Sequence, residues 1–169
     1  MITAIDFRIL GFIQEKMRCK ALDCIMPKIS MLGNFGIIWI ICVIMLISSN
    51  KYEDTGEQIT IGLIVGILLG NVLLKHIFAR PRPCWVDRDK PLLIKEPKDY
   101  SFPSGHTLSS VISASVLIHT NLLLGMIALA ICLLILFSRM YLFVHYPSDI
   151  LGGALLGIII AEVVLKLCI

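Results

Sequence analysis

Three long stretches of this sequence contain no charged residue, and they restrict what the chain can fold into. They cover residues 29–50, 58–74 and 121–138, and each approaches or reaches the length of a helix that crosses a bilayer. Hydrophobic residues make up 57% of the 169 residues and charged residues only 16%, proportions unlike those of a soluble globular protein. The sequence therefore predicts an all-α, polytopic membrane protein.

The expected helices form one bundle. Five membrane-spanning helices are predicted near residues 29–49, 57–79, 104–119, 121–143 and 148–168. The N-terminal segment 1–28 can place five apolar residues on one helical face, with charged residues flanking or opposite it: Ile2, Ile5, Ile9, Phe12 and Ile13 against Asp6, Arg8 and Glu15. This pattern predicts an interfacial amphipathic helix, although an ordinary packing helix would have nearly the same shape. Without a visible second domain or repeat, residues 1–169 are expected to form a single domain.

Several other functions and features are not indicated. Charged residues interrupt any apolar core in the first twenty residues, so no cleaved signal is expected. The six cysteines form no CxxC pair, so neither a disulfide framework nor a metal cluster is predicted. A net charge of +3 is small and gives no indication of nucleic-acid binding. The sequence makes no prediction of the oligomeric state.

The alternation of membrane helices gathers the polar residues on one face. The second and fourth expected helices end on that face, and the third and fifth begin there. The residues collected in this way are Lys75, Arg80, Arg82, Ser104, His106, Arg139, His145 and Asp149. The loop 80–103 contains or borders five prolines and is expected to be an ordered connection outside the hydrocarbon. Ionisable residues at helix ends within a bundle are costly and usually functional.

The collected residue types suit a phosphate group. Lys75, Arg82 and Arg139 are fixed cations, and the planar arginine fork matches phosphate oxygens. The free N–H groups at the start of the third helix, after Ser104, would face the same anion. Gly105 allows the backbone to approach it closely.

The histidines suit the transfer of that phosphate. His145 precedes Asp149 by four residues, and Pro147 between them favours a turn into a helix. Asp149 can hold one imidazole nitrogen and leave the other free to attack. His106 can donate a proton to the departing alkoxide.

Each of these residues also has a simpler explanation. Ser104 and Asp149 could serve only as helix caps, and loop cations could serve only as topology signals. The topology explanation is preferred for Arg88, Lys90, Lys95 and Lys98. A wet, hydrogen-bonded interface is preferred for His76 and His119. The simpler explanations do not account for the presence of all the pieces on one face.

In three motifs the sequence resembles the type 2 phosphatidic acid phosphatase family, the membrane-bound relatives of vanadium haloperoxidases. "KHIFARPRP" places a lysine six residues before arginine-proline, and "PSGH" follows at 103–106. "SRMYLFVHYPSD" then gives serine-arginine, five residues, histidine, three residues and aspartate. The motifs run from Lys75 to Asp149, nearly half of the chain. Arg80 matches no motif position.

The resemblance implies a role for each matched residue. The residues implied to bind phosphate are Lys75, Arg82, Ser104, Gly105 and Arg139. His106 would be the general acid, and His145 the nucleophile that forms a phosphohistidine intermediate. Asp149 would orient His145. The phosphatases of this family need no metal, so no cofactor is expected. Many members have six spanning helices, whereas here the first is reduced to the N-terminal segment.

The expected function is removal of the terminal phosphate from a membrane-anchored phosphomonoester or diphosphate. Undecaprenyl diphosphate, phosphatidic acid and phosphatidylglycerophosphate are all candidates, because the motifs read the phosphate and ignore the tail. The alternative is a non-catalytic lipid-phosphate binder or transporter, which would use the cations and leave the histidines idle. A vanadate-dependent peroxidase is a third possibility that the membrane setting disfavours.

Two signals disagree on the location of the site. Ten basic residues besides Lys75 and Arg82 flank its face: Arg8, Lys16, Arg18, Lys20, Lys28, Arg80, Arg88, Lys90, Lys95 and Lys98. The positive-inside rule would place this face in the cytoplasm. The family resemblance points to the outer face, and the expectation is a plasma-membrane protein with an extracytoplasmic site.

Overall fold

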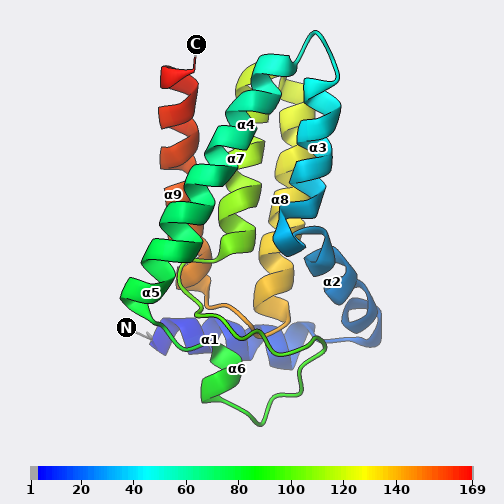
Figure 1. Cartoon of the computed structure of the whole chain (residues 1–169). Coiled ribbons are helices and arrows are strands. Elements are labelled where there is room, and N and C mark those ends of the chain that lie inside the picture. The colour runs from blue at the N-terminus through cyan, green and yellow to red at the C-terminus, as the bar shows by residue number, and fades with distance from the viewer. Residues whose placement is uncertain (1–3, 169) are drawn as a thin grey trace.

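The computed structural model describes residues 4–168, and in that range it contains helices and connections but no strand. Helices α3, α4, α7, α8 and α9 stand side by side as a bundle, and α1 lies across one end of it (Figure 1). The N-terminal helices are α1 (Ala4–Phe12), its π-helical continuation η1 (Ile13–Met17), α2 (Lys20–Leu32), the 3-10 turn η2 (Asn34–Gly36) and α3 (Ile37–Ile47). The later helices are α4 (Glu53–Gly66), the π-helical η3 (Ile67–Leu74), α5 (Lys75–Phe78), α6 (Pro83–Val86), α7 (Gly105–Thr120), α8 (Leu122–Tyr141) and α9 (Pro147–Leu167).

Helix α7 is the centre of the bundle. It packs against α8, α9 and α4, and more lightly against α3. Its buried residues are small or apolar, so the neighbouring helices approach it closely. Ser110 of α7 accepts a hydrogen bond of 3.0 Å from the buried indole N–H of Trp39. The side of the bundle away from α7 carries exposed large apolar residues such as Leu123 and Leu155, as expected for a surface that faces lipid.

Three helical stretches among the described residues are long and apolar enough to cross a membrane: Glu53–Val86, Leu122–Tyr141 and Pro147–Leu167. The pair α2 and α3 passes the same test only as one span bent by 48°. Helix α7, with 16 residues, is shorter than a complete span but is enclosed by the others. The later expected helices therefore agree with the structure to within a few residues.

The expectation of a continuous first span over residues 29–49 is wrong. Phe35 and Gly36 have positive φ angles of 53° and 69°, which interrupt the helix. Helix α3 alone has 11 residues and is about 17 Å long, short of the roughly 30 Å hydrocarbon core. An apolar block hides this break because composition does not record backbone handedness.

The expected interfacial helix over residues 1–28 is also wrong as a single helix. Arg18 and Cys19 have extended backbone angles that separate α1 and η1 from α2, so residues 20–28 belong to α2. Ile5 and Phe12 of α1 are exposed, which agrees with a face turned toward lipid. Ile2 lies outside the described residues. Asp6, expected on the polar face, is instead buried against the bundle.

Candidate active site

A large cavity opens near the end of the bundle that α1 crosses. It has a volume of about 1560 Å³ and lies between α2, η2 and α3 on one side and α4 and η3 on the other. Its polar end is lined by six of the expected site residues: Lys75, Arg82, Gly105, His106, Arg139 and His145. Its apolar part includes Val43, Leu63 and Ile64, the last 53% exposed on the outer surface of the bundle. The cavity therefore joins a cationic pocket to an apolar groove that borders the lipid-facing surface.

The other two expected residues, Ser104 and Asp149, are fully buried behind the wall of this cavity. Ser104 is the N-cap of α7, and its hydroxyl accepts hydrogen bonds from the backbone N–H and the hydroxyl of Thr107, at 3.4 and 3.0 Å. Its own N–H donates to the backbone carbonyl of Asp149 at 3.2 Å. Ser104 thus fixes the start of α7 beside α9. A contact of Ser104 with phosphate stays a prediction.

Two of the expected phosphate-binding cations hold a carboxylate of the chain. Lys75 forms an ion pair with Asp99, and Nη2 of Arg82 donates to Asp99 Oδ1 at 2.8 Å. Burial by itself would raise the pKa of Asp99, but Arg82 and Lys75 outweigh it and lower the pKa to about 2. The Asp99 side chain is 53% exposed, whereas those of Lys75 and Arg82 are 9% and 2% exposed. The solvent-accessible carboxylate of Asp99 is therefore paired with two buried cations.

The third cation, Arg139, comes from the last turn of α8. Its Nη1 donates to the hydroxyl of Ser30 on α2 at 2.5 Å. Its Nε is buried and has no hydrogen-bond partner within residues 4–168. A buried donor without a partner is costly in a protein interior. Arg139 lines the cavity, so an anion bound there would supply the missing acceptor.

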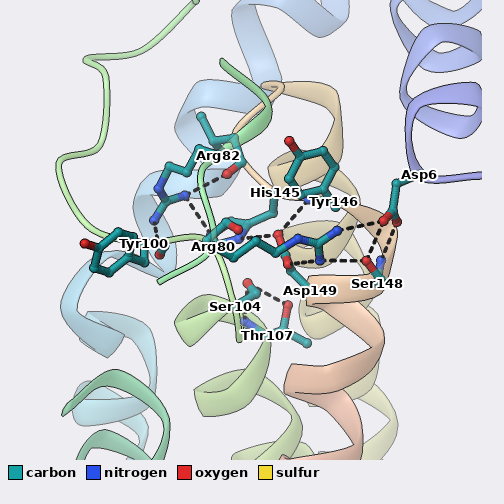
Figure 2. A network of polar contacts seen from close by, with 12 residues as sticks. Asp6, Arg80, Arg82, Tyr100, Ser104, Thr107, His145, Tyr146, Ser148 and Asp149 are labelled. Atoms are coloured by element: carbon teal, nitrogen blue, oxygen red, sulfur yellow. Dashed lines mark hydrogen bonds and ion pairs between the residues drawn. The ribbon is translucent and has the colours of Figure 1, made fainter. Parts of the chain in front are cut away.

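The geometry around His145 fixes its tautomer. Nη1 of Arg82 lies 3.0 Å from Nε2 of His145, and because a guanidinium only donates, Nε2 must be the accepting nitrogen (Figure 2). The proton of the neutral ring is then on Nδ1, which lies 3.5 Å from Oδ2 of Asp149. Burial lowers the pKa of His145 well below 6.5, and the cations Arg82, Arg139 and Lys75 lower it further. His145 is therefore neutral at physiological pH, with a lone pair on the nitrogen that faces the cations.

His106 and Gly105 stand at the start of α7 on the other side of the pocket. Nε2 of His106 is 3.0 Å from Oδ1 of Asn34, in the turn that breaks α2 from α3. Gly105 packs directly on Asn71, since a Cβ added to Gly105 would lie 2.6 Å from Asn71 Oδ1. The missing side chain lets the first turn of α7 reach the cavity.

Comparison with known proteins identifies the family. The model of the PAP2 superfamily matches residues 57–168, which contain all three motifs. This chain belongs to the PAP2 superfamily. Two solved PAP2-like structures resemble it over nearly its whole length. Aquifex aeolicus LpxE has 30% sequence identity and a TM-score of 0.85, covering 97% of this chain and 96% of its own. A PAP2-type phosphatidylglycerolphosphate phosphatase from Bacillus subtilis has 28% identity and a TM-score of 0.77, covering 96% and 84%.

Curated relatives of this PAP2 chain have related names. The undecaprenyl-diphosphatase of Sulfolobus acidocaldarius is 34% identical over 71% of this chain, but the match spans only 58% of that relative. Undecaprenyl-diphosphatase BcrC of Bacillus subtilis is 30% identical over 83% of this chain and 72% of its own. Phosphatidylglycerophosphatase B of the same organism is 31% identical over 82% and 71%. Together with the apolar helices, these likenesses identify an integral membrane protein with an all-helical PAP2 fold.

The PAP2 motifs did not single out Arg80, which the structure places in contact with the site. Arg80 forms ion pairs with Asp149 at 2.6 Å and with Asp6 at 2.8 Å (Figure 2). Both carboxylates are buried, at 0% and 2% side-chain exposure. The sequence offered one signal for Arg80, its place in "ARPRP" two residues before Arg82. It offered none for Asp6, because only the fold brings α1 to α9.

Asp99 and Asn34 were also missed. Asp99 lies in the proline-containing loop among other charged residues, where nothing in its neighbours distinguishes it. Asn34 sits in an apolar block whose break the sequence did not reveal. Across residues 4–168, no three His, Cys, Asp or Glu side chains are grouped as ligands for a metal ion. The expectation that the chemistry needs no metal stays a prediction.

Proposed function

We propose that this PAP2 protein is a lipid phosphatase that removes a terminal phosphate from a membrane-anchored monoester or diphosphate through a phosphohistidine intermediate, without a metal. The observation that carries the proposal is the surroundings of His145. A neutral imidazole directs its lone pair toward Arg82, at 3.0 Å, in a cationic pocket that continues into an apolar groove. A phosphatase with a lipid substrate needs both halves of such a cavity.

In the binding step, phosphate oxygens take the positions now held by the Asp99 carboxylate. Lys75 and Arg82 then pair with the substrate, and the buried Nε of Arg139 gains an acceptor. The N–H groups at the start of α7 add donors and the positive end of the helix dipole. A loose phosphoryl-transfer transition state carries its charge on the equatorial oxygens, so these preplaced donors stabilise it.

In the chemical steps, Arg82 releases Nε2 of His145 and that lone pair forms a bond to phosphorus. The bond between phosphorus and the leaving oxygen breaks, and His106 donates its proton to that oxygen. Nδ1 keeps its proton and faces Asp149. Water then attacks phosphorus and gives a proton to His106. The bond to Nε2 breaks, and inorganic phosphate is released.

The lipid tail is assigned to the apolar part of the cavity. Val43, Leu63 and Ile64 offer hydrocarbon contacts, and the bend between α2 and α3 leaves the groove beside the lipid-facing surface. The names of the relatives support polyprenyl diphosphates and phosphatidylglycerophosphate as substrate types. We further propose a plasma-membrane location with the pocket on the extracytoplasmic face, which the family motifs support.

The test is phosphate release by purified protein in detergent, in the presence of a chelator, from a panel of lipid mono- and diphosphates. His145→Ala should lower the rate by a factor on the order of 10⁴ or more, as expected for loss of a nucleophile. His119→Ala is the matched control, because His119 is an exposed histidine bonded to its own helix. A lipid-phosphate binder without catalysis would show no release and equal lipid binding by wild type and His145→Ala.

A further inference from the structure

The N-terminal helix contributes a buried charge to the polar network behind the pocket. Asp6 of α1 accepts from Arg80 Nη2 at 2.8 Å, and Arg80 Nη1 donates to Asp149 Oδ1 at 2.6 Å (Figure 2). The three side chains are between 0% and 8% exposed. Arg80 is therefore held between two carboxylates that lie 143 positions apart in the sequence, at 6 and 149.

Asp6 is also fixed to the first turn of α9. Its Oδ1 accepts the backbone N–H of Ser148 at 3.0 Å, and its Oδ2 accepts the Ser148 hydroxyl at 2.7 Å. An anion is favourable at the N-terminus of a helix, where N–H groups lack intrahelical partners. Arg80 joins the same group, since its Nη1 also donates to the Ser148 hydroxyl at 2.8 Å.

Aromatic rings cover this group of charges. The Arg80 guanidinium lies 4.3 Å from the centre of the Tyr146 ring, and Phe7 packs edge-on against the same ring at 5.6 Å. Rings on this side exclude water and raise the strength of each ionic contact. The contact of α1 with the bundle is thus a low-dielectric part of the site.

The ion pair between Arg80 and Asp149 determines which carboxylate oxygen of Asp149 is available to His145. Arg80 takes Oδ1, while Oδ2 accepts the backbone N–H of Tyr146 at 2.9 Å and lies 3.5 Å from Nδ1 of His145. Oδ2 is therefore the oxygen turned toward the ring. Its ability to stabilise a positive imidazole depends on how much of its charge Arg80 neutralises.

We propose that Arg80 and Asp6 are positioning residues for the His145–Asp149 pair: Arg80 orients Asp149, and Asp6 competes for the guanidinium so that Asp149 keeps negative charge toward His145. This inference rests on the proposed phosphohistidine chemistry. In that intermediate His145 carries phosphorus on Nε2 and a proton on Nδ1, so its ring is a cation. The first turn of α9 and the N-terminal helix then stabilise it together.

A double-mutant cycle tests the inference with Asp6→Asn, Arg80→Gln and the double variant, each checked for folding by size exclusion and melting temperature. Each single variant should lose about tenfold or more in kcat with KM changed less than about threefold, because the substrate contacts remain. The double variant should match Arg80→Gln, because Asp6 has no guanidinium to compete for once Arg80 is replaced. A double variant whose loss equals the product of the two single losses would show independent roles and overturn the charge role. Arg18→Gln, which removes another N-terminal ion pair, with Asp23, is the control and should keep the wild-type rate.

A second measurement does not require turnover. Histidine-selective NMR gives the protonation midpoint of His145 in the resting protein. The groups that face this ring are Lys75, Arg82, His106, Arg139 and Asp149, and none of them is replaced in any of the four proteins. The midpoint should fall in Asp6→Asn, because Arg80 then neutralises Asp149 more fully, and it should move back in the double variant. Identical midpoints in all four proteins would reject the inference even with an active enzyme. Shifted midpoints in a protein that releases no phosphate would reject the proposed function and keep the positioning.

Discussion

Arg82 lies against both the nucleophile candidate and the backbone that carries it: Nη1 is 3.0 Å from Nε2 of His145 and donates to the carbonyl of Val144 at 2.7 Å. On its other edge, the same guanidinium donates a hydrogen bond to the carboxylate of Asp99. Under the proposed function, this one planar side chain orients the attacking lone pair and binds phosphate. The substrate phosphate then takes the place of Asp99 beside Arg82.

Arg82→Lys should therefore reduce kcat strongly, although the substitution keeps the positive charge. Lysine keeps the charge but lacks the fork that reaches Val144, His145 and the anion together. We expect kcat to fall about 100-fold, as for loss of a preplaced transition-state donor. Steady-state kinetics on a lipid phosphate would measure it. Arg88→Lys, in the exposed part of the loop, is the matched control, and equal rates for both variants would contradict the assigned role.

The pH–rate profile should be bell-shaped, because hydrolysis needs His145 neutral and His106 protonated in the free enzyme. The pKa of His145 lies well below 6.5, so its neutral, active form increases as pH rises through that lower value, and the acid limb should fall below pH 6.5. The groups around the ring that share in this titration are Lys75, Arg82, His106, Arg139 and Asp149. The second limb reports loss of the His106 proton, and it should also lie below pH 6.5, because burial and the cations Arg139, Arg82 and Lys75 disfavour that proton. A hydrolysis rate that does not change from acid to alkaline pH would exclude the paired roles of His145 and His106.

Asp99→Asn should strengthen phosphate binding, because the resident carboxylate competes for Lys75 and Arg82. Its side chain is 53% exposed, so the effect is that of a partly solvated ion pair. We expect the inhibition constant of inorganic phosphate to fall about fivefold. Asp89→Asn, an exposed change in the same loop, should leave it unchanged. Weaker phosphate inhibition in Asp99→Asn would mean that Asp99 orients the cations instead of competing for them.

The same variant should change stability with pH. The pKa of folded Asp99 is about 2, below its ordinary value of 3.8, so its ion pairs stabilise the fold above pH 3.8 and lose that effect as pH falls through 2. Asp99→Asn should therefore melt at a lower temperature than wild type at pH 7. The gap in melting temperature should close as the pH approaches 2.

Gly105→Ala should reduce kcat/KM about tenfold, equivalent to 1.4 kcal/mol. The added Cβ would lie 2.6 Å from Oδ1 of Asn71, so the first turn of α7 or Asn71 has to move. Gly11→Ala is the control, because nothing lies within 4 Å of its added Cβ. Kinetics and melting curves of both proteins separate a local effect on the pocket from a general loss of stability. Equal activities would show that the close approach of α7 is not needed.

Native cysteines can report the proposed sidedness. Cys19 and Cys24 are exposed, Cys19 as the N-cap of α2 and Cys24 within α2. Helix α2 lies toward the end of the bundle that α1 crosses (Figure 1). A membrane-impermeant maleimide applied to intact cells should label them if that end is extracytoplasmic. Cys19→Ser/Cys24→Ser is the control and should remove the label. Labelling that requires permeabilised cells would place the pocket in the cytoplasm.

The sequence predicted the helical bundle and the residues that line the pocket better than it predicted the contacts around them. Uncharged blocks locate α4 and α8, because an apolar stretch of that length is typical of a membrane-spanning helix. Helix alternation then brings Lys75, His106 and His145 to one end without knowledge of packing. The break at Phe35 and Gly36 was missed because left-handed residues leave no trace in hydropathy.

The burial of Asp6 could not be predicted for a different reason. An amphipathic pattern assigns charged residues to water, and a buried carboxylate is stable only if a partner arrives from elsewhere in the chain. That partner, Arg80, is 74 positions away. Asp99 was missed in the same way, since its partners Lys75 and Arg82 were assigned to an external phosphate. In each case the missing information was a tertiary ion pair.

Under the proposed function, the bend of 48° between α2 and α3 gives one of the two products a route of its own. Under the proposed function, the dephosphorylated alcohol leaves through the apolar groove into hydrocarbon. Inorganic phosphate leaves past Asp99 toward water. The two products enter different phases as soon as they leave the protein. Reversal would need a free phosphate and a membrane-confined alcohol to meet again in the same pocket, so the separation of the products into two phases disfavours it.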